Sequence, residues 1–277
     1  MAFPTVPLAA AGRVLSNTQA NTTATRTFPS LTGLTKNSGD LLIALIMAYQ
    51  TGTGTNAAFS GWTGSFTEFH DSATTTTMAM GAAYKWSTGS ETGTIAVTQA
   101  GAITGHAAMI LLSIADANQS TPPEGGSRAS GTTAAADPAS FDPTGWNTED
   151  TLWIAMAGSG ETGTGGAFTG LVSSPTNYSD DVLTGISADV VGGVDGGVGF
   201  RQLNAPSVDV GTWSVDVSNA RNAAVVIGVR PLVVASHPPM RNPYPSNAAV
   251  QRAATWCLAD KWDRRRSGIL VPRALTA

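Results

Sequence analysis

Side chains able to support acid–base or nucleophilic chemistry are few in this 277-residue chain. Histidine occurs at three positions, His70, His106 and His237. Nucleophilic catalysis usually needs such a base beside a hydroxyl or thiol. His70 ends one strand-like segment, His106 begins another, and His237 lies among prolines. The Gly-x-Ser-x-Gly pattern of a nucleophile elbow does not occur, so we expect no catalytic histidine.

Paired carboxylates could hydrolyse glycosides if they faced each other across a cleft. The candidates are the neighbours Asp180 and Asp181 and the Gly-rich stretch 189–195, which ends at Asp195. Neither has the spacing of a calcium loop, so both are predicted to be solvated turns. The Gly-rich segment 158–166 lacks the Lys-Ser/Thr ending of a phosphate-binding loop and is predicted to be a flexible loop.

Metal and cofactor motifs are not indicated either. Cys257 is the only cysteine, which excludes an intramolecular disulfide and a cysteine-based zinc site. We therefore expect a protein that is not an enzyme and has no cofactor, metal or catalytic residue.

Tryptophan is the side chain best suited to a ligand here, because an exposed indole ring can stack on a sugar. Trp86, Trp153 and Trp213 lie in strand-like patterns among apolar residues and are predicted to be core. Trp62 lies in a Gly-rich turn, and it is the candidate ligand contact, with a glycan as the ligand. A wider sugar platform would combine Trp62, Trp86, Trp146, Trp153 and Trp213.

The elements that must position these residues are predicted to be strands. Only 12% of residues are charged, and 31 are glycine, which favours short strands and turns over helices. The runs 41–47 and 109–114 are apolar on both faces and predict strands covered on both sides. We predict an antiparallel β-sandwich of jelly-roll or immunoglobulin-like type. Its strands are expected at 26–31, 40–49, 66–70, 78–86, 94–99, 106–114, 151–157, 181–186, 197–203, 212–217 and 223–229.

Four segments recur in the same order, which indicates an internal duplication. The matches, at offsets between 110 and 118, pair 39–44 with 149–155, 83–85 with 199–201, 93–97 with 211–215, and 107–111 with 223–227. Residues 116–136 are rich in Ser, Thr, Pro and Gly and are predicted to be the linking loop. The predicted sandwich halves are 1–120 and 121–235, as two sandwiches or as two halves of one.

The segment 236–277 differs in proline content and charge. Prolines between 231 and 245 predict an extended connector, and Ser246 or Asn247 can cap a short helix that ends near Arg266. The segment has seven Lys or Arg and two Asp, a net charge of +5, whereas the remainder has eight and seventeen, a net charge of −9. We predict a basic assembly arm that uses Trp256, Leu258, Trp262, Arg264, Arg265 and Arg266.

Targeting and partners follow from the same sequence. A run of three arginines is short and the chain has a net charge of −4, so nucleic acid is not the expected partner. The N-terminus lacks the basic and apolar regions of a secretory signal. The longest apolar run, 41–49, is far below the ~20 residues needed to cross a bilayer. We expect synthesis in a host cytoplasm without a signal peptide, and no membrane contact.

Six motifs in their order carry a family resemblance: Gly39–Ala44, Gly61–Thr63, Ala83–Trp86, Ala129–Thr133, Asp150–Ala155 and Ala223–Pro231. Over residues 12–231 the chain resembles a duplicated β-sandwich module of bacteriophage virion proteins and some bacterial surface proteins. The resemblance implies a non-catalytic structural or adhesive role. With no signal peptide, we expect a virion structural component, either a head decoration or a minor tail protein, which forms homo-oligomers and packs on other virion proteins. The alternative is a tail-tip adhesin that binds a host glycan or receptor.

Overall fold

A computed structural model describes residues 2–5, 12–19, 24–49, 58–71, 78–99, 105–132, 135–161, 171–184, 193–215 and 220–233. Met1–Val233 and Val234–Ala277 are separate compact units, and the fold described below is that of the first. The predicted connector, short helix and arm residues (Trp256, Leu258, Trp262, Arg264, Arg265 and Arg266) lie outside the described residues.

Two antiparallel sheets make up the first half. Its described residues form β1 (Val14–Gln19), β2 (Thr25–Ser30), β3 (Ser38–Tyr49), β4 (Phe59–Ser60), β5 (Thr67–Asp71), β6 (Met78–Thr88), β7 (Thr94–Gln99) and β8 (Ala107–Ile114). A 3-10 turn, η2 (Leu31–Gly33), follows β2. The large sheet has the order β1-β8-β3-β6-β5, and the small sheet has the order β2-β7-β4.

The second half repeats this topology. Its described strands are β9 (Glu124–Gly125), β10 (Ala129–Gly131), β11 (Ala135–Ala136), β12 (Glu149–Glu161), β13 (Leu171–Ser173), β14 (Ser179–Thr184), β15 (Val194–Ala205), β16 (Trp213–Val215) and β17 (Ala220–Val229). The large sheet has the order β10-β17-β12-β15-β14, and the small sheet has the order β11-β16-β13. Each strand of the first half therefore has a counterpart in the same place, while β9 is an addition that pairs with β17. The antiparallel all-β prediction is confirmed, and the strand orders show the internal duplication.

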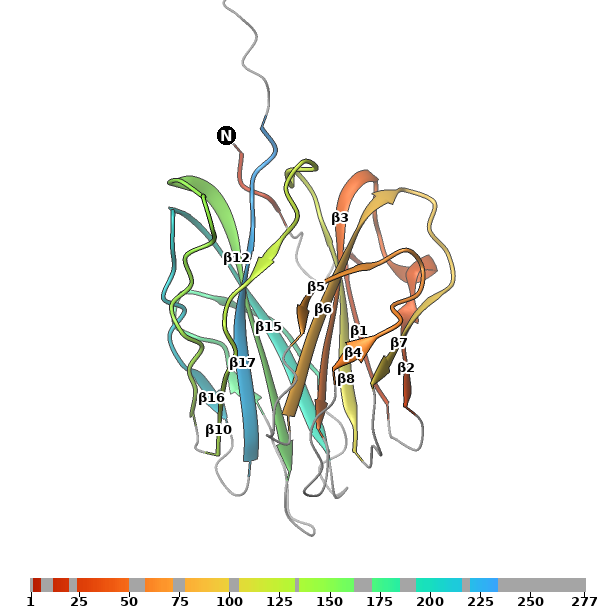
Figure 1. Cartoon of the computed structure of the whole chain (residues 1–277), viewed down its shortest axis with the longest axis vertical. Helices are drawn as coiled ribbons and strands as arrows, with labels where there is room; N and C mark the ends of the chain where they lie inside the picture. The colour runs from red at the N-terminus through yellow and green to blue at the C-terminus, as the bar shows by residue number, and fades with distance from the viewer. Residues whose placement is uncertain are drawn as a thin grey trace, which may run out of the picture. The chain divides into compact units, whose positions relative to one another are not determined.

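The four sheets lie in four layers, with the two large sheets face to face and a small sheet outside each (Figure 1). Between the large sheets lies a central core that includes Leu45 and Ile110 of the first half and Ile154 and Val225 of the second. A first outer core around Phe28 lies beneath the small sheet β2-β7-β4. A second outer core, around Trp213, lies beneath β11-β16-β13.

This layering explains the apolar runs in the sequence. β3 is buried at every position from Asp40 to Tyr49, because alternate side chains enter the central core and the first outer core. β8 is buried throughout for the same reason. By contrast, β7 belongs to an outer layer and buries only alternate residues, Ile95, Val97 and Gln99. The burial of β3 and β8 confirms the two strands predicted to be covered on both faces.

The structure corrects the last of the four repeat matches by one residue. Ile43 pairs with Tyr84 and Leu112, whereas Ile154 pairs with Phe200 and Ile227. Leu112 therefore corresponds to Ile227, an offset of 115, and not the 116 predicted from the match of 107–111 with 223–227. A shift of one residue moves a side chain to the opposite face of a strand, so the equivalent of Ile110 is Val225 in the central core.

Four segments predicted as loops or turns contain strand residues. The predicted linking loop 116–136 includes β9, β10 and β11, which pair with β17 and β16 at the sheet edges. The predicted flexible loop 158–166 begins inside β12. The predicted turn at Asp180 and Asp181 lies in β14, and Asp195 is a buried residue of β15. Edge pairing depends on the neighbouring strand, so the Gly- and Ser-rich composition of these segments did not reveal it.

Candidate functional site

Three of the five tryptophans considered for a sugar platform are buried. Trp153 and Trp213 are fully buried in the second half, as predicted for core residues. Trp146 is also buried; its indole N–H donates to Glu124 at 2.8 Å, and the Arg230 guanidinium lies 5.3 Å from its ring centroid. Trp86 is half-buried against the central core, where its ring meets Tyr84 edge-on. These positions leave Trp62 as the tryptophan of interest.

Trp62 lies between β4 and β5 at the margin of the first outer core. Its ring centroid is 5.8 Å from that of Phe28, in a tilted contact, and its indole N–H donates to Glu68 at 2.7 Å. The ring is half-buried, and the carboxylate that holds it is exposed. The two contacts anchor the loop that carries Trp62 to the sandwich.

The surroundings of the two histidines within the described residues favour the neutral imidazole and do not suit proton transfer near pH 7. Burial and then the nearby Arg128 lower the pKa of His70 to about 4, and its Nε2 has no hydrogen-bond partner. Burial and then Arg26 lower the pKa of His106, whose Nδ1 has no partner. Both imidazoles are therefore neutral at pH 7. His237 lies outside the described residues.

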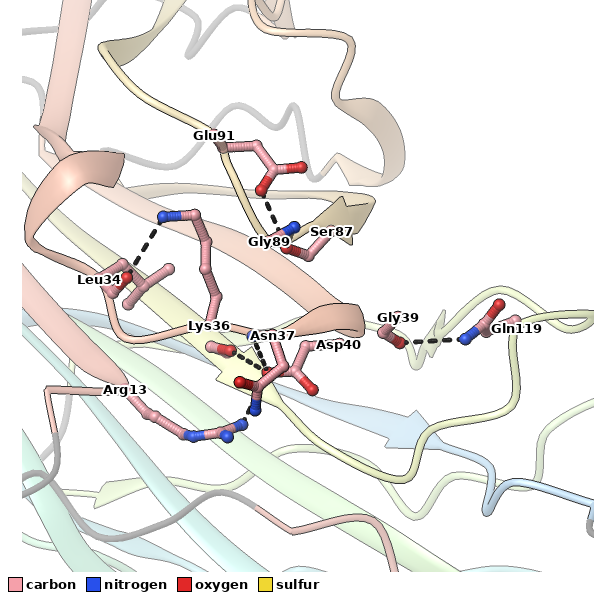
Figure 2. A network of polar contacts seen from close by, with 11 residues as sticks. Arg13, Leu34, Lys36, Asn37, Gly39, Asp40, Ser87, Gly89, Glu91 and Gln119 are labelled. Atoms are coloured by element: carbon pink, nitrogen blue, oxygen red, sulfur yellow. Dashed lines mark hydrogen bonds and ion pairs between the residues drawn. The ribbon is translucent and has the colours of Figure 1, made fainter.

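A polar network holds together the turn between η2 and β3 (Figure 2). Asp40 Oδ2 accepts hydrogen bonds from Arg13 Nη1 at 2.8 Å, from the Asn37 backbone N–H at 2.8 Å and from Ser113 Oγ at 3.1 Å. This arrangement places a charged pair and two further donors around one buried carboxylate. Asp40 is therefore a structural anchor: it joins β3 to Ser113 of β8 and to Arg13, the residue directly before β1.

Glu91 has the same role at the turn that follows β6. Its carboxylate accepts from Ser87 Oγ at 2.9 Å and from the Thr88 backbone N–H at 2.6 Å, and Lys85 Nζ lies 3.7 Å away. Burial opposes ionisation of Glu91, but the hydrogen bonds to the carboxylate prevail and lower its pKa to about 2. Lys36 similarly caps backbone carbonyls, with Nζ 2.7 Å from Leu31 O and 3.3 Å from Leu34 O. Figure 2 shows the contact with Leu34. These charged groups fix turns.

The opposite end of the first half holds the unpaired polar side chains. We call it the loop end: it is where β1 leads to β2, β3 to β4, and β7 to β8. Arg26 is fully buried, and its one hydrogen bond joins Nη2 to Gly105 O at 3.2 Å, while Nε and Nη1 have no partner. Gln99 is also fully buried, with neither amide atom hydrogen-bonded. His106 lies next to Gly105 in the chain, and its pKa responds to Arg26.

Sequence inspection missed this cluster, although a signal was present. Arg26 was assigned to a strand without a role. In a strand, residues two apart share a face, so Arg26 had to point the same way as the buried Phe28. Gln99 likewise follows Ile95 and Val97 on the inner face of β7. Strand alternation applied to polar residues would have found both.

Comparisons with protein-family models, curated proteins and solved structures gave no match. Within the described residues, no helix has the length and apolar character needed to cross a membrane. The same part of the chain contains no group of three or more His, Cys, Asp or Glu side chains able to hold a metal ion.

Proposed function

We propose that this protein is a non-enzymatic structural component of a bacteriophage virion, at the head surface or in the tail. It acts by packing against copies of itself and against other virion proteins. The family resemblance of the strand motifs suggests the virion. The fold supports a structural role through one observation: the two repeated modules share a single central core.

A shared core suits a building block. Two sandwiches joined only by a linker would move relative to each other, whereas modules whose large sheets bury one another behave as one rigid body. A rigid part loses less conformational freedom when it is fixed in an assembly. The charged anchors at Asp40 and Glu91 add to this rigidity, because they fix the turns between strands.

The basic segment 236–277 provides the proposed docking element. Its net charge of +5 complements the −9 of the remaining chain, so it can be steered towards another copy. Exposed ion pairs contribute only ~0 to 1 kcal/mol each, and the apolar side chains Trp256, Leu258 and Trp262 would supply most of the affinity. We therefore expect these apolar side chains to contribute more to assembly than the arginines of the arm.

Sedimentation velocity of the full chain and of residues 1–233 tests the proposal. The full chain is expected to form oligomers, and the truncated chain to sediment as a folded monomer. Trp262→Ala should weaken assembly more than Arg265→Ala, which serves as the matched control within the arm. Equal assembly of the full and truncated chains would show that the arm is dispensable.

A tail-tip adhesin is the second candidate, supported by the half-buried Trp62 and its hydrogen bond to Glu68. Screening the full chain on a glycan array distinguishes the two functions. Selective binding that is lost in Trp62→Ala and partly retained in Trp62→Phe would favour the adhesin, because Phe keeps a stacking ring. Binding to no glycan, with normal assembly, would favour the structural role.

A further inference from the structure

The loop end of the first half buries a cation for which the described residues supply no hydrogen-bonded carboxylate. Arg26 is 0% exposed and is held by one backbone carbonyl, that of Gly105. A guanidinium remains charged at every physiological pH. Burial of an unpaired charge is strongly unfavourable, and burial alone accounts for the lowered pKa of Arg26, about 10.

The connections at the loop end carry no negative side chain in their sequences. Segments 20–24, 50–58, 72–77 and 100–105 contain Ala, Asn, Thr, Gln, Gly, Ser and Ile, and neither Asp nor Glu. Two buried carboxylates of the first half are already occupied at the opposite end: Asp40 by Arg13, and Glu91 by Ser87 and Thr88. Asp71 ends β5 next to 72–77, and its pKa responds to burial, to Glu68 and to the Phe59 backbone, not to Arg26. A counter-ion for Arg26 therefore has to come from elsewhere.

Two neutral groups complete a set of hydrogen-bond donors around Arg26. Val97 is the cross-strand partner of Arg26, and Gln99 lies two residues further along the same inner face of β7. Its side-chain amide supplies two N–H donors and has no partner. His106 stays neutral because burial and Arg26 lower its pKa, so one ring nitrogen carries a proton.

At the same level of the fold, the second half buries polar side chains on its large sheet. Across its large sheet, Ser159 pairs with Asp195 and with Asn222, and all three are buried. The equivalent positions of the first half, related by the same cross-strand pairs, are Ala48, Ala79 and Ala107. The second half therefore buries a carboxylate and two neutral polar groups at this level, whereas the first half has three alanines there.

We propose that the loop end binds a small monovalent anion of the size of chloride, held by Arg26, Gln99 and His106. The guanidinium supplies the charge, and the amide and imidazole supply neutral N–H donors. Because Arg26 and Gln99 are fully buried and His106 is 9% exposed, a bound ion would be shielded from solvent, which favours a small monatomic ion over larger anions. The bound ion joins the ends of β2 and β7 to the start of β8.

Thermal unfolding of the full chain tests the site in sodium chloride and in sodium gluconate at equal ionic strength. Gluconate is too large to enter. With a dissociation constant of about 10 mM, about 200 mM chloride would shift the folding equilibrium constant about 20-fold. The melting temperature of the wild-type chain should therefore be higher in chloride. An equal melting temperature in the two salts would overturn the proposal.

Two variants separate a specific site from a general salt effect. Arg26→Met keeps the length of the side chain, removes the charge and should abolish the difference between the two salts. Arg13→Met removes the paired arginine at the opposite end and should retain that difference, despite a lower melting temperature. Loss of the chloride effect in both variants, or in neither, would contradict binding at Arg26.

Bromide provides a direct measurement that does not depend on the folding of any variant. Wild-type crystals grown with sodium bromide should show an anomalous peak within about 3.5 Å of an Arg26 nitrogen. A water molecule without anomalous signal, hydrogen-bonded to Arg26 and Gln99, would show that solvent and not an anion satisfies these groups.

Discussion

At the scale of single residues, the two ends of the first half differ in how many hydrogen-bond partners their buried charged side chains have. Asp40 receives two side-chain hydrogen bonds and one backbone hydrogen bond, and one of its donors is an arginine. Arg26 is fully buried, and within the described residues it donates one hydrogen bond, to the Gly105 carbonyl. One end is therefore stabilised by groups of the protein itself, and the stability of the other depends on what the solvent provides.

His70 predicts how stability changes with pH. Its pKa in the folded protein, about 4, lies below the ordinary value of 6.5 because of burial and then Arg128. Between these values the unfolded chain binds the proton more readily, so stability is full above pH 6.5 and is lost as the pH falls towards 4. His70→Gln should flatten this slope, measured as the urea midpoint at pH 7 and pH 4.5. An unchanged slope in the variant would show that another group is responsible.

Truncation of Ile110 measures how much a cavity in the central core lowers the free energy of unfolding. Ile110 is 0% exposed on β8 between the two large sheets. Ile110→Ala should lower the free energy of unfolding by about 2 to 5 kcal/mol, measured by urea titration. Leu232→Ala, at a residue that is 38% exposed, is the control and should change it by less than about 0.5 kcal/mol. A small effect at Ile110 would mean that the core there can collapse or is not tightly packed.

At the scale of elements, β3 and β12 are counterparts that have become complementary in shape. Their equivalent positions hold Met47 and Gly158, and Tyr49 and Gly160. A Cβ added at Gly158 would lie 2.9 Å from Met47 Cβ, and one added at Gly160 would lie 2.9 Å from Tyr49 Cβ. The large side chains of the first half therefore fill space that the glycines of the second half leave open. Two copies of the first half could not pack in this way.

This complementarity predicts that Gly160→Ala destabilises the protein by overpacking, by about 1 to 3 kcal/mol in urea unfolding. Gly33→Ala is the matched control, because a Cβ there would make only an ordinary contact of 3.4 Å with Leu15. In a Tyr49→Ala background the added methyl group should cost less, since part of the clash is gone. Additive effects of the two substitutions would argue against direct packing between these strands.

At the scale of the whole described unit, the duplication has produced one folding unit and not two independent ones. The central core draws on β3, β6 and β8 of the first half and on β12, β15 and β17 of the second. Either half alone would expose an apolar sheet face, far larger than the patches that soluble monomers tolerate. The modules therefore depend on each other although each repeats the same topology.

We expect residues 1–120 and 121–233, expressed separately, to aggregate or to bind a hydrophobic dye such as ANS, because the central core would be exposed. Coexpressed, they should associate and regain the far-UV and near-UV circular dichroism of the intact unit. Residues 1–233 are the control and should unfold in one cooperative transition. Two soluble, independently folded halves would contradict the mutual dependence.

The sequence by itself determined where most strands run, that 41–47 and 109–114 are covered on both faces and that the chain contains a repeat, because alternation and apolar runs are local consequences of strand geometry. Only the tertiary structure decided the offset of 115 for the last strand, the edge strands β9 to β11, the fit of Tyr49 over Gly160 and, within the described residues, the lack of a carboxylate partner for Arg26. Each of these depends on which strand lies opposite, a non-local choice that a single strand's pattern does not contain.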